Sequence, residues 1–131
     1  MKPVMQKYIS SKKEYGDCWR ACLASVLECD IEKFPHPKKD EDWDTYYLKV
    51  FDALEKLGFQ WIGYTAQNAD AEVFESKDTD GFIIAVGKSP RSTKRIRYNH
   101  AVVWKNGIVH DPHPDNTGIL DITTFEILKR I

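Results

Sequence analysis

The sequence predicts an α+β domain whose helices come first and whose mainly antiparallel sheet follows. Two segments, 18–28 and 43–57, carry apolar residues at helical spacing. Apolar runs typical of strands follow at 59–64, 81–87 and 99–114. This order, with the helices ahead of the strands, indicates the α+β class.

Length, charge and cysteine content bound the kinds of protein this chain can be. The 131 residues can bury a core without metals or disulfides, and we treat 1–131 as one domain. A net charge of −1 gives no general attraction to nucleic acid or to membranes, so we expect neither as a partner. No apolar run is long enough for a membrane span, and the N-terminus lacks the apolar core of a signal peptide. Three cysteines cannot all pair, which favours free thiols in a reducing cytoplasm.

The first helix is expected to begin at Gly16-Asp17-Cys18. Asp17 is a favoured N-cap residue, which places Cys18 at the first helical position. Unpaired backbone N–H groups and the helix dipole favour a thiolate there, so we expect a lowered thiol pKa. A glycine just upstream lets the backbone approach a substrate closely. Cys22 and Cys29 fit a buried structural role better, which leaves Cys18 as the candidate nucleophile.

The remaining elements outside the hairpin follow from periodicity and turn residues. The second helix, 43–57, ends at Gly58, and residues 72–74 form a short helical turn. The run 81–87 is bounded by glycines and has the composition of a central strand. A short strand at 119–122 and a last short helix through 125–128 complete the chain. We expect the buried stripe of the second helix to consist of Tyr47, Leu48, Phe51, Leu54 and Leu57.

The segment 99–114, N-H-A-V-V-W-K-N-G-I-V-H-D-P-H-P, predicts a β-hairpin. Asn106-Gly107 between apolar runs is typical of a two-residue type I′ turn. That register places His100 opposite His113, on one face with Asp111. His100 and Asp111 are then diagonal neighbours within reach of each other's side chains. The register also pairs Lys105 with Ile108, Trp104 with Val109 and Val102 with Asp111. An imidazole oriented by a carboxylate supplies two thirds of a catalytic triad, and the cysteine of the first helix would complete it.

A basic segment, Lys88 to Tyr98, leads directly into the predicted site. Its sequence, K-S-P-R-S-T-K-R-I-R-Y, holds five basic residues and no acidic ones. As a loop before His100 it is either solvated surface or a binding loop for an acidic partner. We include Arg91 and Asn99 among the residues expected to contact a substrate.

Three motifs together resemble the papain-like cysteine peptidase superfamily. They are G-D-C-W-R-A-C-L-A-S-V-L at 16–27, N-H-A-V-V-W at 99–104 and H-D-P at 110–112. The small domains akin to bacteriocin-processing (double-glycine) peptidases are the most similar. G-K-S-P-R and V-H-D-P-H-P also resemble a small group of uncharacterised bacterial and bacteriophage proteins with this core. The resemblance implies a papain-like fold, in which the nucleophile helix packs on a mainly antiparallel sheet.

The resemblance also implies a role for each site residue. Cys18 would be the nucleophile, His100 the general base and acid, and Asp111 the group that orients the imidazole. Gln6, the upstream glutamine, would donate to the oxyanion together with the backbone N–H of Cys18. The positions expected to contact the substrate are Gly16, Asp17, Trp19, Arg91 and Asn99.

These residues predict a thiol hydrolase that acts on a peptide or protein substrate through a covalent acyl-enzyme. It would be a peptidase or an amidase/isopeptidase without a cofactor. A deamidase or transglutaminase-like acyl transferase remains an alternative. So does a non-catalytic binding protein on the same fold, for instance a phage-encoded inhibitor of a host factor.

A zinc site is a further possibility, and we disfavour it. His110-x-x-His113, His100, Asp111 and the pair Cys18-x-x-x-Cys22 are plausible zinc ligands by residue type. The hairpin register turns His110 away from the other two histidines, and the chain has no C-x-x-C pair.

Overall fold

The computed structural model describes all 131 residues and confirms the α+β class. The helices are α1 (Cys18–Leu27), α2 (Trp43–Lys56) and the short α3 (Ala71–Glu75). The strands are β1 (Phe59–Thr65), β2 (Ile83–Lys88), β3 (Asn99–Trp104), β4 (Ile108–His110) and β5 (Asp121–Arg130). No helix is both long enough and apolar enough to span a membrane.

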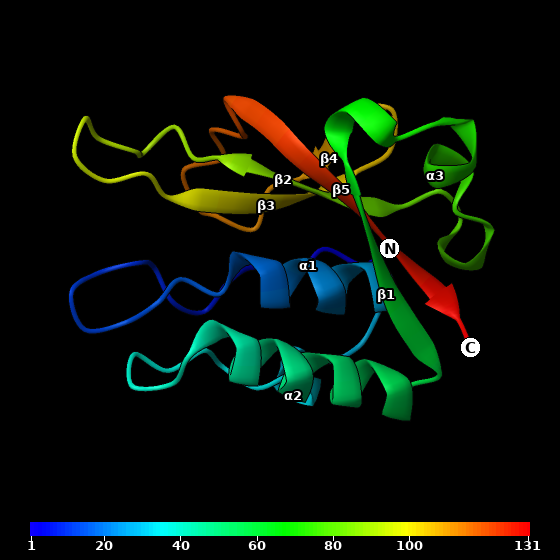
Figure 1. The fold of residues 1–131 in the computed structure, drawn as a ribbon, viewed down its shortest axis with the longest axis horizontal. Coiled ribbons are helices and arrows are strands. Elements are labelled where there is room, and N and C mark those ends of the chain that lie inside the picture. The colour runs from blue at the N-terminus through cyan, green and yellow to red at the C-terminus, as the bar shows by residue number, and fades with distance from the viewer.

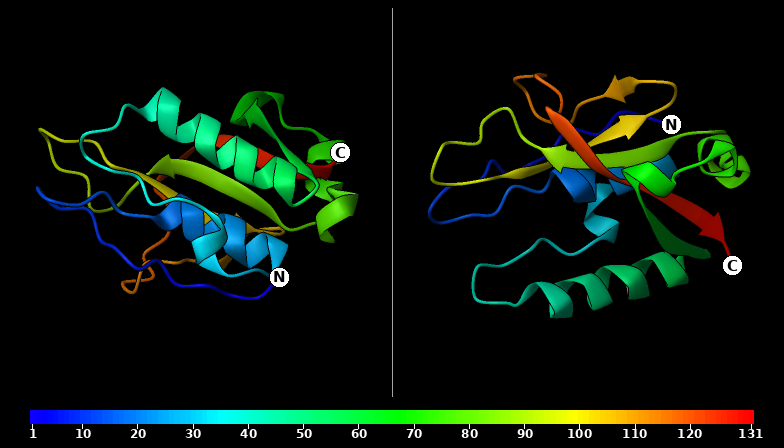
Figure 2. Two further views of the ribbon diagram at one scale, coloured as in Figure 1. Left: turned by 90° about the horizontal axis from the view of Figure 1, so that it is seen from below. Right: turned by 45° about the horizontal axis from the view of Figure 1, so that its top comes forward.

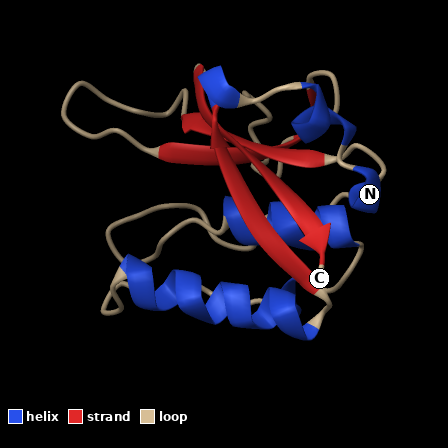
Figure 3. Ribbon diagram, turned by 45° about the vertical axis from the view of Figure 1, so that its right-hand side comes forward, coloured by secondary structure: helices blue, strands red, loops and turns tan.

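The five strands form one antiparallel sheet in the order β1-β5-β2-β3-β4. Helices α1 and α2 lie on one side of this sheet, as Figures 1 and 3 show, and α3 lies on the other. Helix α1 packs mainly on β3, and α2 on β1. The first helix therefore lies directly over the strand that carries His100.

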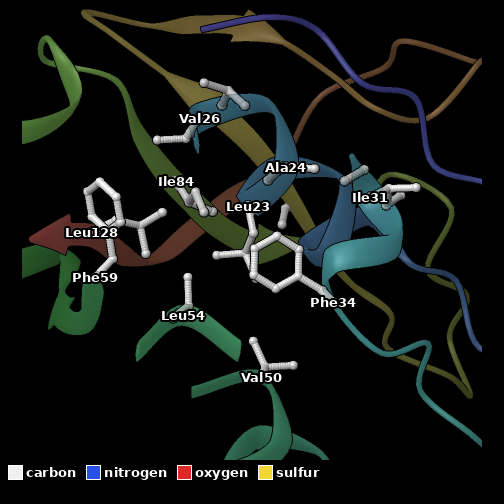
Figure 4. Close-up of a cluster of buried hydrophobic side chains, with 14 of the residues drawn as sticks. Leu23, Ala24, Val26, Ile31, Phe34, Val50, Leu54, Phe59, Ile84 and Leu128 are labelled. Atoms are coloured by element: carbon white, nitrogen blue, oxygen red, sulfur yellow. The ribbon is translucent and has the colours of Figure 1, made fainter. Parts of the chain in front are cut away.

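The core has two parts, one on each face of the sheet. The larger part joins α1 and α2 to the sheet through side chains such as Leu23, Leu54 and Ile84, and Figure 4 shows this cluster. The smaller part packs Val73 of α3 against Phe125 and its neighbours. Burial of apolar surface in these clusters fixes α1 against β3 and thereby the position of its first turn.

Helix α2 occupies the predicted residues, but its buried face differs from the predicted one. Asp42 caps it by accepting a hydrogen bond from the backbone N–H of Thr45 at 2.8 Å. The buried positions are Tyr46, Val50 and Leu54. Tyr47 is 40% exposed and Leu48 69% exposed, so both were wrongly assigned to the buried stripe. Residues 46, 50 and 54 recur at helical spacing just as the predicted stripe does. The aromatic residue at 47 faces a cleft instead of the core.

The C-terminal segment contradicts the predicted short strand and last helix. Residues 121–130 form one long strand, β5, between β1 and β2. A central strand is buried on both faces and therefore does not alternate between apolar and polar residues. The buried Glu126 makes this strand still harder to recognise from the sequence, because a glutamate is rarely buried.

The hairpin is confirmed, with a shifted register at its tip. Val103 pairs with His110 as predicted, but Trp104 pairs with Ile108, because a β-bulge interrupts the ladder. Three residues, 105–107, thus connect the strands, and Asn106 and Gly107 both have positive φ. Strand β4 ends at His110, so the predicted pairings of Asp111 and His113 on the ladder are wrong.

Candidate active site

A cleft of about 690 Å³ opens beside the N-terminus of α1. The loops 9–17, 34–42 and 89–98 project at this end of the molecule, as Figures 1 and 2 show. The first turn of α1, the inner face of α2 and the sheet surround the cleft. Cys18, at the start of α1, and His100, at the start of β3, both line it, so the fold brings together residues that lie far apart in the sequence.

The start of α1 leaves backbone donors free around Cys18. Asp17 is the N-cap residue as predicted, but its side chain makes no cap hydrogen bond. Its carboxylate instead accepts from the backbone N–H of Tyr8 at 2.9 Å and pairs with Arg20 at 3.2 Å. The first intrahelical bond is that of Ala21, which leaves the N–H groups of residues 18–20 without an oxygen acceptor. Donors of this kind can stabilise an anion.

The expected lowering of the Cys18 pKa is wrong. Cys18 is partly exposed to the cleft, yet protein atoms packed around it raise the thiol pKa to about 11 by desolvation. The backbone N–H groups of Ala101 and Trp19 near the sulfur oppose this shift and do not overcome it. Cys18 therefore rests as a thiol at neutral pH, and a base is needed to generate the thiolate. Ala101, whose N–H lies near the sulfur, directly follows His100 in the sequence. The residue that carries the imidazole is therefore adjacent to a residue that touches Cys18.

The predicted contact between His100 and Asp111 is present although its strand geometry is not. His100 Nε2 lies 2.7 Å from Asp111 Oδ1, and both side chains are buried. The backbone N–H of His113 donates to Oδ1 at 3.0 Å, and that of Gly118 donates to Oδ2 at 2.8 Å. Asp111 is thus held by the loop after β4, which bends back under β3.

The surroundings of Asp111 and His100 determine the protonation state of each side chain. Burial opposes ionisation of Asp111, but the N–H of His113, the His100 ring and the N–H of Gly118 outweigh it and hold the carboxyl pKa below its usual value. Desolvation lowers the pKa of His100 despite the neighbouring carboxylate. A neutral imidazole that donates from Nε2 to a carboxylate carries its lone pair on Nδ1. His100 is therefore prepared to accept a proton.

His113 and His110 do not combine with His100 as metal ligands. The His113 ring lies 6.1 Å from that of His100, centroid to centroid, and its Nδ1 accepts from the backbone N–H of Asp115. His110 Nε2 contacts the carbonyl of Val4 at 2.8 Å. No group of three or more His, Cys, Asp or Glu side chains has an arrangement suited to a metal ion.

Gln6 does not line the cleft. Its amide Nε2 donates to the carbonyl of Tyr8 at 2.7 Å, and its backbone N–H donates to the carbonyl of Pro112. The amide lies near Gly16, two residues before Cys18, and its Oε1 is buried without a hydrogen-bond partner. The free backbone donors of α1 are the groups that the structure brings to the thiol.

Four of the five residues expected to contact a substrate line the cleft, namely Gly16, Asp17, Trp19 and Asn99. Arg91 does not line it. Its guanidinium donates to Thr117 Oγ1 at 2.9 Å. Of the basic segment 88–98, only Arg97 and Tyr98 line the cleft.

The sequence analysis missed the aromatic wall of the cleft and a carboxyl group at its base. Rings of α2 and β1 contribute much of the lining, including Trp43, Tyr46, Tyr47, Phe51 and Trp61. Glu126 of β5 lies among them. The four aromatic residues of α2 were the only signal available in the sequence, since Glu126 was assigned to a predicted helix.

The chain was also compared with protein-family models, with curated proteins and with solved structures, and none of the three comparisons found a match.

Proposed function

We propose that the protein is a papain-like thiol hydrolase that cleaves a peptide, amide or isopeptide bond through Cys18, His100 and Asp111. The observation that carries the proposal is the meeting of Cys18 and His100 in one cleft, with Asp111 bonded to Nε2 of the imidazole, which leaves Nδ1 for the thiol proton. A nucleophile, a base and an orienting carboxylate in this order form a complete set for acyl chemistry.

The resting protonation states define the first step. The Cys18 thiol transfers its proton to Nδ1 of His100 as the sulfur attacks the substrate carbonyl, because a thiol of pKa about 11 is not ionised beforehand. The new C–S bond converts the carbonyl oxygen into an oxyanion. The N–H of Cys18 would hydrogen-bond that oxygen, as expected from the sequence. The N–H of Trp19, which lies near the sulfur of the resting thiol, would take the place expected of Gln6.

The second half returns the proton. His100 donates it to the leaving amine as the C–N bond breaks, which leaves an acyl thioester on Cys18. Water, deprotonated by His100, then attacks the thioester and regenerates the thiol. An amine in place of water would give an acyl transferase, and the partly open cleft supports both acceptors. Hydrolysis is the proposal because it is the reaction of the peptidases that the sequence motifs resemble.

Acylation by p-nitrophenyl acetate tests the proposal without knowledge of the natural substrate. We expect wild-type protein to gain one acetyl group on Cys18, detected by mass spectrometry, and to release it slowly to water. Cys18→Ala should abolish this acylation. Cys29→Ala, which removes another partly exposed thiol, is the matched control and should behave as wild type. Acylation that is absent, or that falls on Cys29 as fast as on Cys18, would contradict the proposal.

A further inference from the structure

The base of the cleft holds a carboxyl group that the proposed chemistry does not use. Glu126 of β5 lies opposite Gly63 of β1 and Ile84 of β2, on the face that α1 covers. It is only 7% exposed, and none of the ion pairs of the molecule includes it. Buried glutamates are usually paired, because burial penalises their charge and raises the carboxyl pKa, as it does here.

Aromatic rings surround this carboxyl group. Trp19 Nε1 donates to Glu126 Oε1 at 2.7 Å, and the Trp19 ring meets that of Tyr47 edge-on at 5.6 Å. The Trp61 ring lies across Gly63, where a Cβ would come within 2.5 Å of the indole. Only glycine at this position lets the Trp61 ring lie so close to the sheet, beside Glu126. The Trp61 Nε1–H makes no hydrogen bond of normal geometry, but it lies close enough to Glu126 to oppose, with the Trp19 N–H, the rise of the carboxyl pKa.

We infer that this end of the cleft binds the ammonium or guanidinium group of a Lys or Arg residue of the substrate, between Glu126 and the rings of Trp19 and Trp61. As a statement about the substrate it rests on the proposed function. A bound cation gives the carboxylate a positively charged partner in addition to the neutral indole donors that the protein provides. Indole faces attract cations, and the aliphatic stem of a long basic side chain packs against aromatic rings.

The other charged groups of the cleft leave Glu126 as its one available carboxylate. Asp17 is paired with Arg20, and both side chains are buried. Lys39 lies over the Tyr15 ring at 3.9 Å, and Arg97 is an exposed residue of the loop 89–98 that also lines the cleft. These two positive groups repel a cation, so the favourable position for one is beside Glu126.

The position of Trp19 connects the proposed cation-binding end of the cleft, here called the cation pocket, to the proposed reaction at Cys18. Trp19 follows Cys18 in the first turn of α1, and its indole reaches Glu126. A side chain held there therefore belongs to a residue close to the bond under attack. The pocket would select substrates by a basic residue near that bond.

Binding to the Cys18→Ala variant tests the pocket without any chemistry. Isothermal titration calorimetry would compare N-acetyl-lysine amide with N-acetyl-norleucine amide, which has a similar stem and no charge. We expect the lysine amide to bind at least about tenfold more tightly. Glu126→Gln should remove the preference while it keeps an acceptor for Trp19. Glu55→Gln, an exposed change of the same charge on α2, should preserve it.

Equal or undetectable binding of the two amides would overturn the inference, and so would a preference that survives Glu126→Gln. The comparison of the two amides does not depend on the folding of the Glu126 variant. The p-nitrophenyl esters of the same two amino acids separate the pocket from the proposed function. If both esters acylate Cys18 at equal rates, the pocket is refuted and the hydrolase stands. If the lysine amide binds through Glu126 but neither ester acylates Cys18, the pocket stands and the hydrolase is refuted.

Discussion

Nε2 of His100 and Oδ1 of Asp111 lie 2.7 Å apart, and the two residues reach this contact from different kinds of structure. His100 is fixed by β3 within the sheet, whereas Asp111 is held in the loop after β4 by two backbone N–H groups. The His113 N–H binds the same oxygen as the imidazole, and the Gly118 N–H binds the other, so both carboxylate oxygens are held. The carboxylate orients the ring by its position and needs no further side chain for support.

Asp111→Ala should remove the acceptor of the His100 Nε2–H. Without that acceptor the imidazole no longer prefers the tautomer whose lone pair lies on Nδ1, where the proposed mechanism needs a base. We expect acylation of Cys18 to fall between about 10²- and 10⁴-fold. The lost bonds to backbone N–H groups should also lower the free energy of unfolding by about 1–3 kcal/mol. Asp115→Ala, an exposed change in the same loop, is the control, and equal losses in both variants would contradict the assignment.

Alkylation of Cys18 by iodoacetamide should be slow at neutral pH and rise through the alkaline range. Burial raises the thiol pKa from its ordinary value of 9.0 to about 11, so the reactive thiolate increases with pH until about 11. Mass spectrometry of the alkylated peptides, at pH values from about 6 to about 11, measures how the alkylation rate of Cys18 depends on pH. A plateau already reached below pH 8 would show a preformed thiolate and imidazolium pair instead.

The buried ion pair beside Cys18 should contribute strongly to stability. The Asp17 side chain is fully buried, and the Arg20 side chain is 4% exposed. Arg20→Met leaves the Asp17 charge without a partner, which we expect to cost about 3–5 kcal/mol in urea denaturation. The double variant with Asp17→Asn should recover part of the loss. Lys56→Met removes an exposed ion pair with Asp52 and should change stability by less than about 1 kcal/mol.

Gly87 of β2 pairs with His100 and should tolerate no side chain. A Cβ at this position would lie 1.7 Å from the carbonyl oxygen of Asp121, in the β-bulge between β2 and β5. The backbone must shift to accommodate alanine, so Gly87→Ala should lower the free energy of unfolding by at least about 1–3 kcal/mol. It should also slow acylation of Cys18, because β3 moves with β2. Unchanged values of both quantities would refute this account of the glycine.

Much of the fold could be predicted because its signals are local. The glycine and aspartate before Cys18 and the apolar spacing after it defined α1, and Asn106-Gly107 defined the hairpin. Elements whose environment is set by distant partners were harder. Strand β5 lies between two other strands, so its residues face the core on both sides and show no alternation.

The candidate site divides in the same way, because some of its features have local signals in the sequence and others depend on distant contacts. Residue type and order along the chain were sufficient to select Cys18, His100 and Asp111. The pKa of Cys18 could not be predicted, because it depends on the atoms of β3 that fold over the sulfur. Glu126 could not be recognised either, since only the pairing of β5 with β1 and β2 brings it beneath Trp19.

The most direct test of the account is the rate at which p-nitrophenyl acetate acylates Cys18 at pH 7 in wild type and in His100→Ala, with circular dichroism to confirm that the variant folds. If His100 takes the proton of a thiol whose pKa is about 11, the variant should react about 10²-fold or more slowly, and its rate should recover as the pH is raised toward that pKa. Equal rates at pH 7 in the two folded proteins would show that Cys18 and His100 do not act together, and the hydrolase proposal would fall.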